Sequence, residues 1–61
     1  MDPTSEQLLA FYQIVRRVVL LSSFIAFVEL APDENLYVYV GRYDASESSV
    51  ICILPNGDYE L

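Results

Sequence analysis

Few residues in this chain have side chains suited to binding or catalysis. Asp33, Glu34 and Asn35 are adjacent and offer oxygen ligands for a cation, and Asp44 and Glu47 offer two more carboxylates. A calcium loop needs oxygen ligands at regular spacing and a glycine at its sharp turn, and neither group has them. We therefore interpret both groups as solvated turns rather than as metal sites.

The basic and sulfur-containing residues lead to a similar conclusion. Arg16 and Arg17 are able to grip a phosphate or carboxylate, but surface ion pairs are the more common outcome for such residues. Arg42 is expected to pack at a strand end and form an ion pair. Cys52 is the single cysteine, and the chain has no histidine to activate it or to complete a zinc site. We expect no cofactor, no metal and no enzymatic activity.

Length and composition predict one domain, residues 1–61, that does not remain alone. The chain is 54% hydrophobic, which is a large share for 61 residues with little interior to hold it. Without a disulfide or a metal, a chain this short commonly depends on oligomerisation for stability. The net charge of −6 argues against direct nucleic-acid binding and against an anionic membrane surface.

The longest uncharged run is too short to cross a membrane. It extends from Val18 to Val28, which is 11 residues, whereas a spanning helix needs about 20. The acidic N-terminal residues also lack the basic start of a signal peptide. These features predict a cytoplasmic protein with Cys52 reduced.

The spacing of apolar residues predicts one helix over residues 5–22. Thr4 and Gln7 have the spacing of a capping box at its start. Ala10 belongs to the stripe that we expect to face water. Leu20 and Leu21 lie where the helix is apolar all round, which indicates a second surface that needs cover. The expected buried face consists of Leu8, Phe11, Tyr12, Val15, Val18 and Val19.

After the helix, the pattern favours strands at 24–30, 36–43, 49–54 and 58–61. We expect the loop at residues 31–35 to pair Leu30 with Leu36. A type I′ turn is expected at Asn56-Gly57 because this dipeptide strongly favours two-residue hairpins. The predicted class is α+β, with the N-terminal helix packed on a four-stranded antiparallel meander.

Five-residue loops would set the pairing of the first three strands. They would pair Val28 with Val38, Val38 with Leu54, and Val40 with Cys52. Paired residues share a face of the sheet, so Cys52 would lie under the helix. Gly41 would then lie on the other face with the tyrosines, where the missing side chain allows either a ring or a backbone to approach closely.

That other face is the candidate interaction surface. A contiguous apolar patch with a polar rim is typical of an interface, and tyrosine suits one because its ring is buried while its hydroxyl keeps a partner. We expect it to make a homodimer or a higher oligomer. The candidate interface residues are Ile25, Phe27, Tyr37, Tyr39, Tyr43, Ile51 and Ile53, together with Leu20 and Leu21 of the helix.

The C-terminal part of the chain resembles a family of proteins. An apolar run is followed by Pro55-Asn56-Gly57, an acidic residue and an aromatic one. This ending, after a helix and strands, is similar to that of short uncharacterised bacterial proteins of the kind met in cyanobacteria. The resemblance implies a fold and assigns no functional residue.

Together these patterns predict a small acidic non-enzymatic protein that acts through self-association and protein–protein interaction. Two alternatives stay open. One is an acidic regulator, such as an antitoxin or a nucleic-acid mimic, that neutralises a basic partner protein. The other is an accessory subunit of an enzyme, with a site at a seam between two chains.

Overall fold

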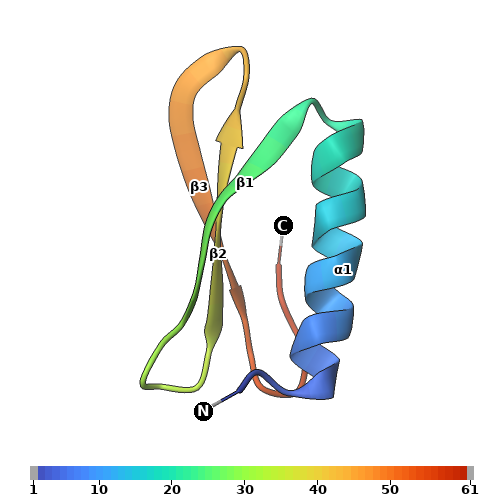
Figure 1. Cartoon of the computed structure of the whole chain (residues 1–61), viewed down its shortest axis with the longest axis vertical. Helices are drawn as coiled ribbons and strands as arrows, with labels where there is room; N and C mark the ends of the chain where they lie inside the picture. Colours follow the sequence, from blue (N-terminus) through green and yellow to red (C-terminus); the bar gives the residue numbers. More distant parts are fainter. Residues whose placement is uncertain (1, 61) are drawn as a thin grey trace.

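The computed structural model describes residues 2–60, without the side chain of residue 45. One helix, α1 (Ser5–Leu20), is followed by the strands β1 (Ser23–Leu30), β2 (Leu36–Arg42) and β3 (Ala45–Ile53). The strands form an antiparallel sheet in the order β1-β2-β3, and α1 lies along one face of it (Figure 1). The predicted α+β class is confirmed.

The helix begins where the capping box predicts. The Gln7 amide donates to the Thr4 hydroxyl oxygen at 3.1 Å, and the Thr4 amide donates to the Gln7 side-chain oxygen at 2.9 Å. These bonds satisfy two of the amides that have no partner in the first turn of a helix. The helix ends at Leu20, two residues earlier than expected, and Ser22 adopts a φ of 56° that turns the chain into β1.

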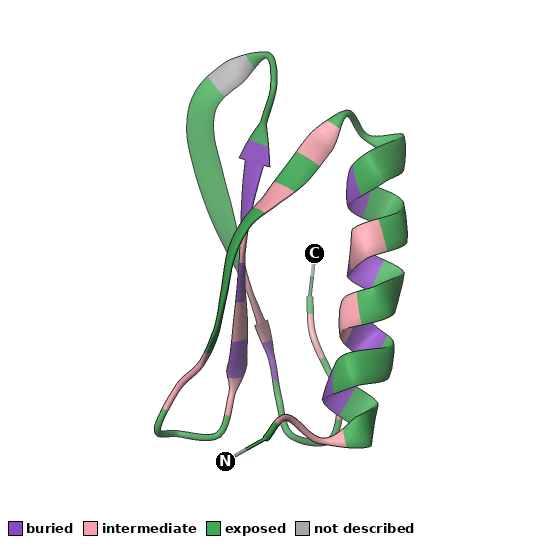
Figure 2. Cartoon of the chain, in the orientation of Figure 1, coloured by how far each residue is buried: buried purple, intermediate pink, exposed green. Residues whose placement is uncertain are grey.

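The core lies between α1 and the facing side of β2 and β3 (Figure 2). Within the described residues, the buried apolar side chains are Ala10, Ile14, Val18, Leu36, Val38, Val40 and Ile53. Half-buried side chains pack around them, namely Phe11, Ile25, Leu30, Ile51 and Tyr59.

The predicted buried face of the helix is correct only in part, since Val18 is buried and Phe11 and Val15 are half-buried. Leu8, Tyr12 and Val19 are exposed, whereas Ala10, which we expected to face water, is 4% exposed. Most sides of this helix carry apolar residues, so periodicity alone does not select one. Hydrogen bonds of Gln7 to the Glu34 carbonyl in the β1–β2 turn and to the Ile53 carbonyl at the end of β3 fix the rotation instead.

The predicted register of β1 and β2 is confirmed near their connecting turn. Leu30 pairs with Leu36 and Val28 pairs with Val38. Beyond that point the register shifts between Ile25 and Phe27, so that Ile25 packs against the core rather than on the outer face. An extra residue in a bulge reverses the alternation of side chains, which explains the error at Ile25.

The predicted register of β2 and β3 is wrong. Val38 pairs with Ile51 and Leu36 pairs with Ile53, so each β3 partner lies three positions earlier than expected. An odd shift exchanges the two faces of a strand. Ile51 and Ile53 therefore point toward the helix. The cause is a tight turn at residues 43–44, which pairs Arg42 with Ala45 and lets β3 begin there instead of at residue 49, together with an adjacent register shift that pairs Gly41 with Ser48.

The β1–β2 turn and the turn after β3 have the same design. In the first, the amide of Glu34 donates to the Ala31 carbonyl at 2.9 Å, and Glu34 has a φ of 70°. In the second, the amide of Gly57 donates to the Leu54 carbonyl at 2.8 Å, and Gly57 has a φ of 91°. Each is a proline-led turn that ends on a left-handed residue, as in three-residue hairpin loops.

This geometry overturns the predicted type I′ turn, because Asn56 does not have the positive φ that such a turn needs at both central residues. Residues 58–60 form no strand, and the end of the predicted fourth strand, Leu61, lies outside the described residues. The C-terminal segment instead runs back between sheet and helix (Figure 1), where the Tyr59 hydroxyl donates to the Gln13 side-chain oxygen at 3.3 Å. Between residues 2 and 60, no helix is both long and apolar enough to span a membrane.

Candidate interaction surfaces

The face of the sheet that points away from the helix carries a row of aromatic rings. The rings of Phe27 and Tyr39 lie with centroids 5.7 Å apart, and those of Phe24 and Tyr43 are 5.0 Å apart. Both pairs are tilted, an arrangement favoured between aromatic rings. We call the five residues Phe24, Phe27, Tyr37, Tyr39 and Tyr43 the aromatic face.

Gly41 makes room for one of these rings. A Cβ atom at this position would lie 2.5 Å from the Phe24 ring, far inside van der Waals contact. The expected close approach at Gly41 is therefore confirmed, and of the two alternatives, a ring or a backbone, it is a ring, that of Phe24. Covering a strand glycine with a ring shields its backbone from water, and here it also fixes the position of Phe24 on the aromatic face.

Hydrogen bonds hold the polar end of the aromatic face. The Tyr37 hydroxyl donates to one oxygen of Asp33 at 2.8 Å, and the Asn35 amide donates to the other at 3.0 Å. These bonds, that of the Asn35 amide first, lower the pKa of the Asp33 carboxyl below its usual value. The Asp33 carboxylate thus accepts hydrogen bonds that stabilise the β1–β2 turn. Among the described residues, no group of three or more potential metal ligands is present.

The structure separates the predicted interface residues into three sets. Phe27, Tyr37, Tyr39 and Tyr43 lie together on the aromatic face. Sequence reasoning missed three apolar residues beside them, which are Phe24, Val50 and Leu54. Phe24 pairs with Gly41 across the two strands. A large ring opposite a residue without a side chain is a signal in the sequence that could have placed Phe24 on this face.

The other predicted interface residues lie elsewhere. Ile25, Ile51 and Ile53 face the core, and Ile53 is fully buried. Leu20 and Leu21 remain exposed at the end of α1, by 84% and 66%. They do not belong to the aromatic face.

A second apolar surface runs along the outside of the helix. Leu8, Leu9, Tyr12 and Val19 are all more than half exposed there. The Arg16 guanidinium lies 5.9 Å from the centre of the Tyr12 ring, within the range of a cation–π contact. The arginine keeps this part of the helix partly polar, which distinguishes it from the aromatic face.

The remaining arginines lie near the C-terminal end of the helix. Arg42 forms the expected ion pair, with Asp44 at 3.0 Å, and both side chains are largely exposed. Arg17 and Arg42 border a pocket of about 360 Å³ between α1 and the inner side of β2 and β3. Glu60 also lines this pocket.

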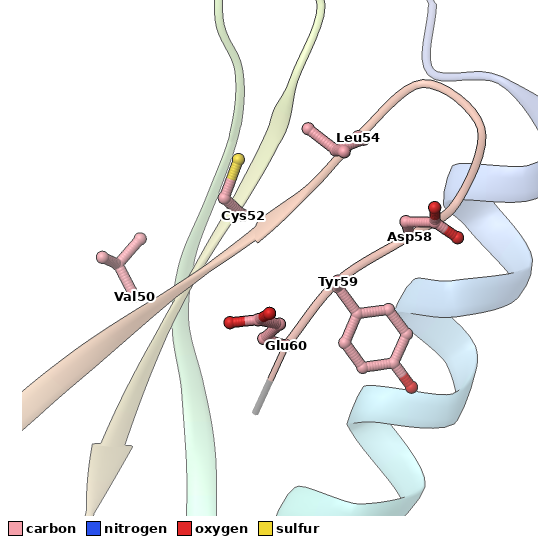
Figure 3. A pocket seen from close by; sticks show the side chains of 6 residues that line it. All are labelled: Val50, Cys52, Leu54, Asp58, Tyr59 and Glu60. Carbon is pink, nitrogen blue, oxygen red and sulfur yellow. The ribbon is translucent and has the colours of Figure 1, made fainter.

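A larger groove follows the free edge of β3. It has a volume of about 710 Å³ and lies between β3 and the C-terminal segment. Figure 3 shows the two stretches of chain diverging after the turn, with Tyr59 directed toward the helix and Glu60 toward β3. The residues that line the groove are Val50, Cys52, Leu54, Asp58, Tyr59 and Glu60.

Cys52 belongs to this groove and not to the core. It pairs with Tyr37 and is half-buried, so the prediction that it lies under the helix is wrong. The three-residue shift in the register of β3 is the reason, because from Ser48 onward it moves the even-numbered residues of that strand to the outer face.

No protein-family model, no curated protein and no solved structure matches this chain. The two surfaces and the groove are therefore the features from which function is argued.

Proposed function

We infer that this protein acts through association with other proteins, beginning with a second copy of itself, and that the aromatic face is the surface buried. The observation that supports this most directly is the exposure of large apolar groups on one side of the sheet. Phe27 is 58% exposed and Val50 is 53% exposed. Among the described residues, no element of the chain covers that side (Figure 1).

The total surface supports the same proposal. The described structure exposes 4412 Å², whereas a compact monomer of 6.9 kDa exposes about 4,000 Å². The shape is elongated, with extents of 34 × 20 × 17 Å. A layer of helix on one face of a three-stranded sheet leaves the other face bare, and a second copy placed there would supply the missing layer.

The chemistry of the aromatic face suits a protein partner. Tyrosine rings add large contact areas at low cost in side-chain entropy, and they are enriched in interfaces. The Tyr37 hydroxyl already has a partner in Asp33, so burying this ring leaves no polar group unpaired there. Glu29, which pairs with Tyr37 at the edge of the same face, supplies part of a polar rim.

Light scattering of the purified chain tests the proposal. At 50 μM we expect a mass of at least twice 6.9 kDa. Phe27→Arg should give a folded monomer because it places a charge within the buried surface. Leu9→Arg, at a similarly exposed site on the outside of α1, is the matched control and should leave the mass unchanged. A folded wild-type monomer, or a Phe27→Arg dimer, would overturn the assignment.

A further inference from the structure

The two edges of the sheet differ in how they are protected. An exposed edge strand offers unpaired backbone groups to any other strand, and natural edges are commonly blocked by bulges or charges. The edge strand β1 has a bulge between Ile25 and Phe27 and carries Glu29. The edge strand β3 has a register shift and the charge of Glu47 only at its start, between Ala45 and Ser48. From Ser48 to Ile53 its ladder is regular, and this stretch contains no proline and no charged residue.

The backbone direction of β3 follows from the bond at its end. The Leu54 amide donates to the Asp58 carbonyl at 2.9 Å, on the side away from β2. Amide and carbonyl groups of alternate strand residues point to the same side. Those of Cys52 and Val50 therefore also point away from β2, and within residues 2–60 neither has a backbone partner on that side.

The space beside these groups is the groove of about 710 Å³. Its volume falls in the range of sites that hold ligands of substantial size. The C-terminal segment forms its far wall, and Glu60 is directed from that wall toward β3 (Figure 3). Asp58 and Glu60 are the charged residues of the lining, so the groove is acidic.

We propose that this groove binds an extended peptide segment of another protein, in which basic and apolar residues alternate, as a strand added to the edge of β3. Strand addition is a recurrent mode of peptide recognition, in which backbone bonds give affinity and alternate side chains give specificity. One set of side chains lies beside Val50 and Leu54 on the outer face. The other set faces Asp58 and Glu60, whose carboxylates attract basic groups.

Charge favours a basic segment over a second copy of this chain at the same edge. Pairing two β3 edges would bring together the carboxylates of two chains, each with a net charge of −6. The proposed peptide site adjoins the surface of self-association described above and shares the exposed side chain of Val50 with it, but its backbone bonds are made elsewhere. It uses the edge of the sheet and the C-terminal segment, whereas the dimer uses the aromatic face.

Three peptides test the proposal by fluorescence anisotropy. The probe is a fluorescein-labelled octapeptide of alternating lysine and valine, and we expect saturable binding that weakens as salt is raised. A peptide with glutamate in place of lysine should bind at least tenfold more weakly. The lysine peptide with N-methyl groups on alternate residues should also lose at least tenfold, because it lacks the amides that pair with β3. Equal binding of either control peptide would overturn the proposal.

Hydrogen exchange locates the bound strand on the protein. The amide protons of Val50 and Cys52 should exchange rapidly in the free chain and at least tenfold more slowly with the lysine peptide bound. If the lysine peptide binds but leaves both amide exchange rates unchanged, the binding is general charge attraction. That result would overturn strand addition. This readout requires no variant, so it does not depend on a substitution that impairs folding.

Matched variants separate this site from the dimer. Glu60→Gln should weaken peptide binding severalfold, whereas Glu29→Gln, on the other edge of the sheet, should not. Phe27→Arg should keep peptide binding even though it loses self-association. Loss of peptide binding by Glu29→Gln as well as by Glu60→Gln would show that net charge, not this groove, is recognised.

Discussion

The side-chain amide of Gln7 donates a hydrogen bond of 2.8 Å to the carbonyl oxygen of Glu34, 27 residues further along the chain. The same amide also donates to the Ile53 carbonyl at 3.1 Å. Its oxygen meanwhile caps the helix at Thr4, and the residue is 1% exposed. One buried side chain thus connects the helix, the β1–β2 turn and the end of β3.

Replacing Gln7 should therefore be costly. Gln7→Leu loses three hydrogen bonds and leaves the buried Ile53 carbonyl and the part-buried Glu34 carbonyl without this partner, for an expected loss of about 2–4 kcal/mol in the free energy of unfolding. Gln7→Glu should be comparably unstable at pH 7, because a carboxylate cannot donate to Glu34 and Ile53. Urea denaturation measures both, and Gln13→Glu, at an exposed position, is the control. A Gln7→Glu variant as stable as wild type would contradict the role of the amide.

Neighbouring residues of β3 test the register. Ile53 is fully buried, so Ile53→Ala should cost about 2–5 kcal/mol. Leu54 is 43% exposed, and Leu54→Ala should cost less than about 1.5 kcal/mol. Thermal or urea melts of the two variants give the comparison. A larger loss for Leu54→Ala would restore the alternative register, in which even-numbered residues face the helix.

The paired turns respond differently to substitution. Gly57→Ala should destabilise the chain by about 1–2 kcal/mol or more, because φ is 91° and the new Cβ would lie 2.9 Å from the Glu6 carbonyl oxygen. Glu34→Gly should be neutral or stabilise by up to about 1 kcal/mol, since it relieves a left-handed non-glycine residue. Urea midpoints decide the sign. Stabilisation by Gly57→Ala would show that the strain does not exist.

The Asp33 carboxylate should make stability depend on pH in the acid range. Its pKa is lower in the folded chain than in the unfolded one, chiefly because of the Asn35 amide. The stabilisation is therefore complete above the unfolded pKa of about 4 and is lost as pH falls through the lower folded pKa. Carbon NMR of the carboxyl group should show the low pKa directly.

Tyr37→Phe provides the control for that titration. It removes the second contributor, the Tyr37 hydroxyl, so the pKa of Asp33 should rise partway and still remain below its usual value. A return to the usual value would assign the whole effect to the tyrosine. No change at all would mean that the hydroxyl does not bind the carboxylate in solution.

The strand β2 and the start of the helix could be predicted from the sequence because each is encoded locally. Alternation of apolar residues and tyrosines from Leu36 to Val40 allows only one burial pattern, and the structure has it. Thr4 and Gln7 similarly define the cap through their own side chains. In both cases a misplacement by one residue would expose apolar groups or leave amides without partners.

The faces of β3 and of the helix could not be predicted in the same way. Residues 50–54 are apolar at every position, so their sequence fits either face, and the turn at residues 43–44 decides between them. The helix likewise has apolar residues on most sides. Its orientation depends on hydrogen bonds from Gln7 to two carbonyls that are distant in sequence. The periodicity of apolar residues does not predict such contacts.

The side-chain hydrogen bonds that join the helix to the turns and to the end of β3 are concentrated at the N-terminal end of the helix. The Thr4 hydroxyl donates to the Pro55 carbonyl at 2.6 Å, close to where Gln7 connects the β1–β2 turn and the end of β3 to the helix. Tyr43 and Asp44, at the tip of the β2–β3 hairpin, are exposed and have no equivalent connection to the helix among the described residues. Local opening should therefore start at that tip and proceed toward the end of the sheet that is bonded to Thr4 and Gln7. The β2–β3 hairpin would then pivot about the end that is hydrogen-bonded to the helix. The free edge of β3 would change its angle to the helix without global unfolding.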